Sequence, residues 1–391
     1  MKTLGIDASR ANVRQRTGTE WYCFHLLQEL VRLIPLDQYQ VTIYVKAPLV
    51  EDLRTLAEHW QVRVLRWPPR LLWTQLRLSL AMLRKSRRPD LLFIPAHTIP
   101  LIHPQQTVYV AHDLGFEREP QLYANTYIGG RIMNIIIRLL TFGKYGTSEL
   151  DYHRWSMRFA VKKAAKIIAI SQFTKTELQH FYSVPNERVA VIYNGYNKPA
   201  AEKDATAPAP ERDLFLYIGR IEHKKNILNL LEAYAQFITT NSTQNKLCLI
   251  GQFGFGQAEI MQKISELKLT NKIILPGYVL QTELAQYWKR AIAFVFPTNY
   301  EGFGIPILEA MSAGVVVACS DIAPLREVGG NACVYFNQQS PRAICSALQN
   351  ISKLSNTERA QYIAAGQQRA SQFSWKRCAD ETWQVLKAQL D

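Results

Sequence analysis

Two carboxylates stand eight residues apart around a glycine turn in the stretch EGFGIPILEA, residues 301–310. The preceding run 291–297 is continuously apolar, which predicts a buried strand. Residues 298–304 then form the loop at the carboxyl end of that strand, where open α/β sheets place their ligands. Pro306 suits the first position of a helix that follows the loop.

The start of this helix predicts an anion site, because its free N–H groups face the loop with the helix dipole behind them and favour a phosphate group. Those N–H groups lie near Phe303, Gly304 and Ile305. Glu309 sits about one turn into the helix, from where its carboxylate can accept hydrogen bonds from paired hydroxyls such as a ribose diol. Glu301, in the loop, lies nearer to whatever extends beyond the phosphates. Taken alone, the two acids also fit a simpler interpretation, in which Glu309 complements the helix dipole and Glu301 is a solvated loop residue.

This segment resembles the acidic motif of the retaining family 4 glycosyltransferases (glycosyl transferases group 1), which have the two-domain GT-B fold. The resemblance implies that the segment binds a nucleotide-diphosphate sugar and that Glu301 is a catalytic residue. The donor-binding residues that it implies here are Glu301, Gly302, Phe303, Gly304, Ile305 and Glu309.

A second motif, YIGRIEHKKN at residues 217–226, resembles the Gly-Arg turn of the same family, with a lysine five residues after the arginine. The resemblance implies that Gly219, Arg220 and Lys225 bind the donor diphosphate, and that Arg220 and Lys225 act in catalysis. A forked guanidinium and an ammonium at a strand end can neutralise a leaving diphosphate without a metal. The alternative is a solvated basic turn.

Three further residues match family positions less specifically. His112, followed by Asp113, resembles the histidine that lies against the transferred sugar in the family, although a histidine at a strand end is often only structural. Gly18 stands where the family has a glycine loop approaching the donor diphosphate, but Glu20 and Trp21 depart from the family pattern there. Tyr278 resembles a residue at the nucleotide base pocket and equally fits a core aromatic.

The alternation of strands and helices predicts an α/β chain with two halves, each built on a parallel sheet. Strands are expected at 3–7, 40–45, 63–66, 91–95, 107–111 and 166–170, and then at 214–218, 246–250, 272–275, 291–296 and 315–318. The resemblance implies the GT-B arrangement of two Rossmann-like domains facing across a cleft, with a C-terminal helix that crosses back to the first domain. The expected divisions are an acceptor domain at 1–196, a linker at 197–212, a donor domain at 213–372 and the returning helix at 373–391.

Composition limits the function classes. At 391 residues and 48% hydrophobic composition, the chain is long enough for two ordinary domains. The six scattered cysteines form no C-x-x-C pair, which predicts buried thiols in a reducing compartment. No signal peptide and no membrane-spanning window is expected, which favours a cytoplasmic protein. The net charge of +14 indicates an acidic partner: nucleic acid, an anionic membrane or a phosphorylated ligand.

The expected reaction is hexosyl transfer with retention, without a cofactor or a metal, since no Asp-x-Asp motif stands in the expected context. Residues 321–328 look most like mannosyl- and glucosyltransferases that make surface polysaccharides. A nucleotide-sugar 2-epimerase of the same fold is the alternative, and a nucleic-acid-binding protein is a weaker one because no recognised binding motif accompanies the charge.

A membrane partner is expected at the inner face of the plasma membrane, where the acceptor would be a glycan or a lipid-linked glycan. Residues 63–88 carry eight basic side chains and no acidic one, interleaved with Trp67, Trp73 and several leucines. Such a segment combines apolar insertion with attraction to anionic lipid. A second apolar stretch follows at 127–142. The alternative is that Leu72, Leu76, Leu80 and Leu83 form the core face of an ordinary crossover helix.

Overall fold

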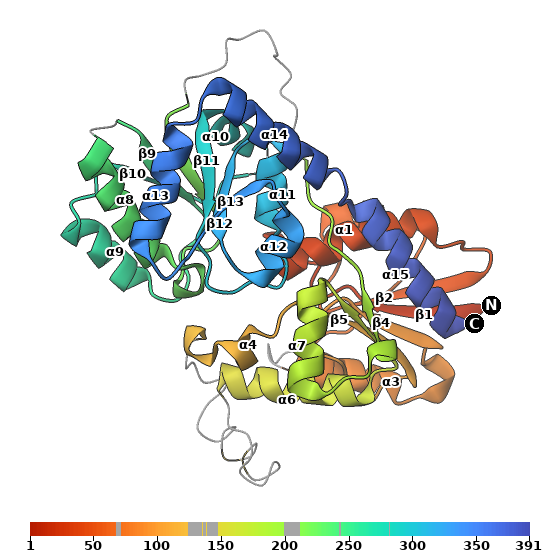
Figure 1. Ribbon diagram of the computed structural model, residues 1–391. Coiled ribbons are helices and arrows are strands. Elements are labelled where there is room, and N and C mark those ends of the chain that lie inside the picture. The colour runs from red at the N-terminus through yellow and green to blue at the C-terminus, as the bar shows by residue number, and fades with distance from the viewer. Residues whose placement is uncertain are drawn as a thin grey trace. The chain divides into compact units, whose positions relative to one another are not determined.

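The computed structural model describes residues 1–67, 72–123, 135, 138, 148–198, 212–241, 244–280 and 282–391 (Figure 1). The chain forms two compact units, Met1–Gly195 together with Ser374–Asp391, and Tyr196–Phe373. Most of the expected linker, Arg70 and nearly all of the apolar stretch 127–142 lie outside the described residues.

The first unit is built on a seven-stranded parallel sheet with the order β3-β2-β1-β4-β5-β6-β7. Its strands are β1 (Lys2–Asp7), β2 (Tyr39–Val45), β3 (Gln61–Val64), β4 (Leu91–Ile94), β5 (Gln106–Ala111), β6 (Lys166–Ala169) and β7 (Val189–Val191). Almost every residue of the central strands β1, β4 and β5 is buried, since helices cover both faces of the sheet.

The main helices of this unit divide between the two faces of the sheet (Figure 1). α1 (Gly18–Leu33) and α15 (Trp375–Leu390) pack together on one face. The other face is covered by α3 (Ser79–Met82), α6 (Glu149–Lys163) and α7 (Gln172–Tyr182), which share one apolar core. Shorter elements are α2 (Glu51–Leu56), η1 (Trp73–Leu78), η2 (Lys85–Arg87), α4 (Gly115–Arg118), η3 (Pro120–Leu122) and η4 (Asn186–Arg188). The C-terminal helix therefore belongs to the first unit, as the family resemblance implies.

The second unit is built on a six-stranded parallel sheet with the order β10-β9-β8-β11-β12-β13. Its strands are β8 (Leu214–Ile218), β9 (Lys246–Ile250), β10 (Ile273–Gly277), β11 (Ala291–Phe296), β12 (Val317–Ser320) and β13 (Cys333–Phe336). Helices α8 (Ile227–Asn241), α9 (Gln257–Glu266) and α13 (Pro341–Ser352) lie on one side of this sheet, and α11 (Ile305–Ser312) and α12 (Ala323–Gly329) on the other (Figure 1). The remaining elements are η5 (His223–Lys225), α10 (Leu284–Arg290) and α14 (Asn356–Ala370). Two Rossmann-like units with parallel sheets confirm the predicted fold class.

The structure confirms one local prediction, corrects two others and adds a helix cap at Ser171. All six cysteines are buried and free. Ser171 caps α7, since its hydroxyl accepts a hydrogen bond from the Thr174 N–H at 3.0 Å. Two strands lie two residues from their expected positions, β3 toward the N-terminus and β12 toward the C-terminus. Residues 315–319 are all buried, so the apolar pattern does not show at which residue β12 begins to pair with its neighbouring strands.

The alternative interpretation, in which four leucines form a core face, is wrong. Within the segment 72–88, the buried apolar side chains are Trp73, Leu78 and Met82. Leu76, Leu80 and Leu83 are 39%, 52% and 52% exposed. The cause is a change of helix type, because η1 is a π-helical turn that follows a left-handed Leu72 (φ 58°), so the 3.6-residue period does not apply there. Among the described residues, no helix combines the length and apolar character needed to cross a membrane.

Candidate active site

The acidic loop lies between β11 and α11, at the carboxyl edge of the second sheet. β11 is completely buried, and the loop that follows it is fastened to the turn after β8. The Asn299 N–H donates to the Lys224 carbonyl at 3.0 Å. The buried Thr298 hydroxyl lies 3.1 Å from the Tyr300 carbonyl oxygen and 3.3 Å from that of Lys224. The two motifs recognised in the sequence, which are about eighty residues apart, therefore form one structural unit.

Gly304 sets the direction in which α11 leaves the loop. Its φ of 105° lies in the left-handed region, and a Cβ at this position would come within 2.5 Å of the Leu325 side chain. α11 begins at Ile305 with Pro306 in its first turn. In this first turn Pro306 has no N–H and the Ile307 N–H donates to the Gly304 carbonyl at 3.1 Å, so the turn would attract an anion mainly through the positive end of the helix dipole.

Glu309 has an unusual environment for a carboxylate. It lies in α11, where burial raises its pKa to about 7, while a hydrogen bond from the Asn197 backbone N–H opposes the shift. A side chain with this pKa is divided between its two protonation states near neutral pH. A ligand that donates hydrogen bonds to it favours the ionised form.

The basic turn after β8 depends on a close approach of two backbones. A Cβ on Gly251, at the end of β9, would lie 1.9 Å from the Gly219 carbonyl oxygen. The Gly219 N–H donates to the Ile250 carbonyl at 2.9 Å, and the Tyr217 hydroxyl donates to the Arg220 carbonyl at 2.7 Å. These contacts fix the backbone of the turn from which the Arg220 side chain extends.

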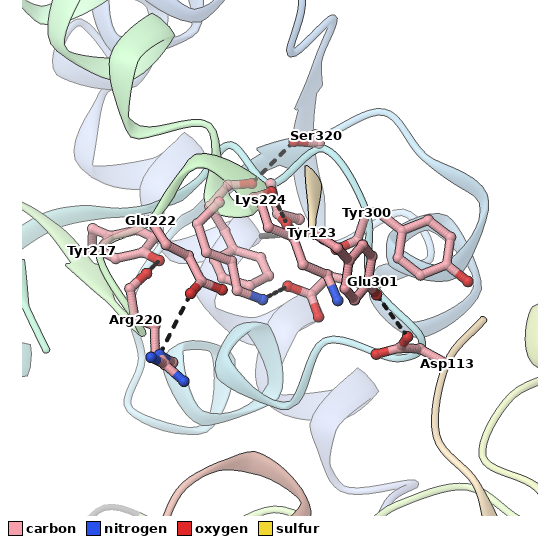
Figure 2. A network of polar contacts seen from close by, with 12 residues as sticks. Asp113, Tyr123, Tyr217, Arg220, Glu222, Lys224, Tyr300, Glu301 and Ser320 are labelled. Carbon is pink, nitrogen blue, oxygen red and sulfur yellow. Dashed lines mark hydrogen bonds and ion pairs between the residues drawn. The ribbon is translucent and has the colours of Figure 1, made fainter. Parts of the chain in front are cut away.

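Arg220 and Lys225 each have a carboxylate partner, and the pair formed by Arg220 and Glu222 is drawn in Figure 2. The Arg220 Nε lies 3.5 Å from the Glu222 Oε2, and the Arg220 side chain is 59% exposed. Lys225 forms an ion pair with Glu301, and these two side chains are only 17% and 15% exposed. Lys225 Nζ also lies 5.6 Å from the centre of the Phe296 ring. The cation expected at the diphosphate and the acid expected at the sugar are thus in direct contact.

Two acids of this region were not anticipated from the sequence. Glu222 contacts Arg220, and it also occupies the space where a Cβ on Gly254 would lie. Glu259, in the first turn of α9, pairs with the His223 Nε2 at 2.8 Å. The available signal was the position of Glu222 between Arg220 and the basic run 223–225, which invites a local ion pair.

Tyr278 directly follows β10 in the chain. In the sheet, β9 lies between β10 and β8. The Gly251 N–H donates to the Gly277 carbonyl at 2.9 Å, which connects this strand end to the basic turn. The Tyr278 side chain is 40% exposed rather than buried. The alternative that it is a core aromatic is therefore wrong, and its ring is accessible to a ligand.

His112 lies in the first unit, just after β5. Its Nε2 is 3.0 Å from the Pro95 carbonyl oxygen. A carbonyl only accepts, so Nε2 carries the proton, and burial lowers the ring pKa and keeps it neutral near pH 7. The Nδ1 atom is then a hydrogen-bond acceptor. The Tyr22 ring packs edge-on at 4.7 Å between ring centres and fixes the imidazole orientation.

Gly18 is the first residue of α1, and a Cβ there would meet no heavy atom within 4 Å. Glu20, which departs from the family pattern, completes a capping box with Thr17. The structure therefore brings the predicted residues of the second unit to one sheet edge and places Gly18 and His112 in the first unit. The residues of the second unit are Gly219, Arg220, Lys225, Tyr278, Glu301, Gly302, Phe303, Gly304, Ile305 and Glu309.

Comparison with known proteins identifies the class. The family described as Glycosyl transferases group 1 matches residues 200–369, and the one described as Glycosyltransferase Family 4 matches residues 16–198. The O-antigen chain mannosyltransferase B of Escherichia coli is 30% identical over 309 residues, which cover 73% of this chain and 78% of that protein. The O-antigen chain mannosyltransferase RfbU of Salmonella typhimurium is 27% identical over 318 residues, covering 81% and 79%.

Among solved structures, the sucrose-phosphate synthase of Thermosynechococcus elongatus superimposes with a TM-score of 0.74 at 18% identity, over 99% of each chain. This similarity confirms the GT-B fold. The chain belongs to the family 4 glycosyltransferases, and it is a glycosyltransferase.

Proposed function

We propose that this glycosyltransferase moves a hexosyl group, with mannose favoured, from a nucleotide-diphosphate sugar to a glycan or lipid-linked glycan in surface polysaccharide synthesis. The observation that supports it best is the connection of the Arg220–Lys225 turn to the Glu301 loop at one sheet edge. The names of the two O-antigen mannosyltransferases similar to this chain favour mannose and a surface polysaccharide.

The proposed donor-binding roles are supported by the geometry of the second unit. Arg220, Lys225 and the first turn of α11 supply positive potential for the diphosphate. Glu309 accepts hydrogen bonds from the ribose hydroxyls. Tyr278 offers its exposed ring to the nucleotide base. Because Lys225 is already in contact with Glu301, the acid is held next to the diphosphate position, where the sugar begins.

The reaction proceeds with retention of anomeric configuration. The bond between the anomeric carbon and the diphosphate oxygen breaks, and its electron pair leaves with the diphosphate. The acceptor hydroxyl attacks from the same face, and its proton passes to the departing phosphate oxygen. Arg220 and Lys225 stabilise the negative charge that develops on the diphosphate, a task that needs no metal ion.

Glu301 and His112 position the sugar in this proposal. Glu301 accepts hydrogen bonds from sugar hydroxyls and lowers the energy of the developing positive charge. The neutral His112 accepts a hydrogen bond from a sugar hydroxyl at Nδ1, because its Nε2–H already donates to the Pro95 carbonyl. Gly18 leaves open space at the start of α1 for close approach of the donor.

An exposed surface of the first unit supports the proposal that the enzyme acts at the inner face of the plasma membrane. We call it the basic apolar surface, and it consists of Leu76, Leu80, Leu83, Arg84, Lys85 and Arg87, all of them exposed. Nearby, Val62 and Val64 on the edge strand β3 are 39% and 38% exposed. Arg63 connects the strand to this surface through a hydrogen bond to the Arg87 carbonyl. Exposed leucines beside unopposed positive charge suit the interface of an anionic bilayer.

A ligand screen tests the proposed donor. Thermal unfolding is measured with UDP, GDP and ADP and with their hexose conjugates. A nucleotide present at about one hundred times its dissociation constant stabilises the protein by about 2.7 kcal/mol. Stabilisation by one nucleotide family, followed by transfer to an acceptor, supports the proposal. Conversion of the donor sugar without any acceptor would point instead to an epimerase, and no response to any nucleotide would contradict the proposal.

A further inference from the structure

Three glycines shape the loop after β9 to fit the basic turn after β8. Gly251, Gly254 and Gly256 follow the strand with the spacing G-x-x-G-x-G. A Cβ on Gly251 would meet the Gly219 carbonyl oxygen, and one on Gly256 would lie 2.2 Å from the His223 ring. Each of these glycines therefore leaves room for one part of the turn, and the space at Gly254 holds an ion pair.

Both side chains of this ion pair lie against Gly254. A Cβ on this glycine would lie 2.4 Å from the Glu222 Oε2 and 3.4 Å from the Arg220 Nε. Gly254 lacks the positive φ that would itself favour glycine, so the requirement here is for space. The Glu222 side chain is only 18% exposed, whereas that of Arg220 is 59% exposed. The acid thus lies in a recess over Gly254, and the guanidinium extends from it toward solvent.

The backbone of Glu222 is fixed on both sides. The Ile221 N–H donates to the Gln252 carbonyl at 2.9 Å, and the His223 N–H donates to the Phe255 carbonyl at 3.1 Å. These bonds continue the pairing of β8 and β9 beyond the ends of the two strands. Glu222 itself is extended, with φ −152° and ψ 167°. Its side chain therefore starts from a well-defined backbone.

The contact with Glu222 uses one side of the guanidinium. The Arg220 Nε lies 3.5 Å from the Glu222 Oε2, as the dashed line in Figure 2 shows. The two terminal nitrogens of Arg220 form no hydrogen bond or ion pair within the described part of the chain. A guanidinium carries its donors in one plane, so a partner at Nε leaves the outer edge, with both terminal nitrogens, for a second partner.

We propose that Glu222 is a positioning residue for Arg220. From its recess over Gly254, the carboxylate holds the Nε side of the guanidinium and presents the outer edge to the distal phosphate of the donor. The pair thereby selects nucleoside diphosphates over monophosphates. The inference rests on the proposed function, which assigns Arg220 to the donor diphosphate, and it adds the residues that set the direction of this side chain.

Selection between the two classes of nucleotide follows from the place of the turn. Lys225, at the other end of the turn, is in contact with Glu301, the acid assigned to the sugar. The phosphate next to the sugar is the distal one, which a monophosphate lacks. An exposed arginine that is not held loses rotamer freedom when it binds, which weakens binding by roughly two- to tenfold. Because Glu222 restricts Arg220 beforehand, a phosphate meets both terminal nitrogens at once.

Two variants of equal charge test this role. Glu222→Gln and Glu222→Ala both remove one negative charge, but only glutamine retains an oxygen that can contact Nε. Calorimetric titration with UDP, GDP and ADP identifies the preferred diphosphate of the wild type, which is then compared with its monophosphate. The Ala variant should bind the diphosphate about fivefold more weakly than the Gln variant, while monophosphate affinity differs by less than about twofold. A general structural defect would weaken both nucleotides alike. Equal diphosphate affinity in the two variants overturns the proposal.

Removal of Arg220 provides the second comparison. In the Arg220→Ala background, the Gln and Ala variants of Glu222 should bind the diphosphate equally, because the side chain that Glu222 positions is absent. A difference that persists there would show that Glu222 acts by another route, and it would also overturn the proposal. Glu259→Gln and Glu259→Ala are the matched controls, since this acid pairs with His223 rather than with Arg220. These two variants should bind the diphosphate alike in both backgrounds.

Gly254→Ala tests the recess without changing any charge. The added Cβ displaces the Glu222 carboxylate, which ends a flexible side chain, so thermal unfolding should stay close to that of the wild type. Diphosphate affinity should fall about fivefold, and monophosphate affinity should stay within about twofold. Unchanged diphosphate affinity would contradict the recess over Gly254 and with it the proposal. A wild type that binds the diphosphate no better than the monophosphate would instead contradict the proposed function, which assigns Arg220 to the diphosphate.

Discussion

The chemistry at the residue scale depends on pairing between acids and bases that come from different motifs. Lys225 is in contact with Glu301 and Arg220 with Glu222, so both cations proposed to bind the diphosphate are adjacent to a carboxylate. A diphosphate that binds there shares the cations with these acids. The shared contact also means that removing one partner changes the surroundings of the other.

Removal of either Arg220 or Lys225, which together form the proposed diphosphate clamp, should slow transfer strongly. Arg220→Ala or Lys225→Ala is expected to lower turnover roughly a hundredfold, the usual cost of losing one charge-stabilising contact in the transition state. Lys246→Ala, at the amino end of the neighbouring β9, is the matched control and should stay within about twofold. Steady-state kinetics with thermal unfolding checks that the effect is catalytic. Near-normal turnover in both clamp variants would remove their proposed role.

Protonation of Glu309 should control nucleotide affinity. In the proposed donor site, ribose hydroxyls donate to the ionised Glu309 carboxylate, and before the nucleotide binds burial raises the pKa of this side chain to about 7. Below that pH, binding must displace a proton, so affinity should fall by up to tenfold per pH unit, and it should level off above it. Calorimetry with the nucleoside diphosphate between pH 5.5 and 8.5 measures this dependence. The Glu309→Gln variant should bind weakly with no such slope.

Glu301→Gln is the companion measurement. This variant should keep the nucleotide affinity of the wild type and its dependence on pH. Sugar transfer should be slowed, because Glu301 is assigned to the sugar rather than to the ribose. Equal loss of affinity in the two variants would show that the acids of the loop are misassigned.

At the scale of elements, the sequence predicted well those strands and turns that depend on residues close together in the chain. The buried runs of β8, β9 and β11 have the expected bounds, since each is a continuous apolar stretch ended by a turn. The turn after β8 and the start of α11 depend on glycines and a proline within a few residues. The Lys225–Glu301 contact could not be read in this way, because it joins residues 76 positions apart.

Two features escaped prediction for different physical reasons. The edge strands β7 and β13 have only three and four residues, too few to show a clear period. In η1, the apolar spacing of four suggested a core face, but the left-handed Leu72 and the π-helical turn rotate Leu76 and Leu80 toward the surface. The core-face alternative is therefore wrong, and the interpretation of this segment as a membrane-facing surface stays a prediction.

The packing of β9 against the basic turn should be intolerant of even one methyl group. Gly251→Ala would place a Cβ 1.9 Å from the Gly219 carbonyl oxygen, at a φ of 143°. We expect a loss of roughly 2–4 kcal/mol of stability from steric overlap and backbone strain together. Gly277→Ala, which meets no heavy atom within 4 Å at a φ of 76°, should cost only about 1 kcal/mol. Denaturant unfolding compares them, and equal losses would refute the close approach.

At the scale of the whole molecule, charge and apolar exposure coincide in the first unit. The net charge of +14 attracts any anionic surface. Charge alone would give weak, nonspecific attraction. In the proposed membrane docking, the exposed Leu80 and Leu83, beside Arg84, Lys85 and Arg87, would add a contact that persists when salt screens the charges.

Vesicle co-sedimentation should therefore show two separable contributions. Binding is expected to rise with anionic lipid content and fall with salt. Arg84→Gln, Lys85→Gln and Arg87→Gln together should weaken it up to about a hundredfold, since each basic side chain near the surface contributes about 1 kcal/mol. Leu80→Ser with Leu83→Ser should instead reduce the binding that remains at high salt.

Arg88 is left unchanged because its Nε donates to the Met82 carbonyl at 2.8 Å and supports the segment. Lys246→Gln, Lys268→Gln and Lys353→Gln, exposed lysines of the second unit, remove the same charge and should have little effect. A wild-type protein that stays in the supernatant with strongly anionic vesicles at low salt would contradict membrane docking and favour an acceptor free in solution.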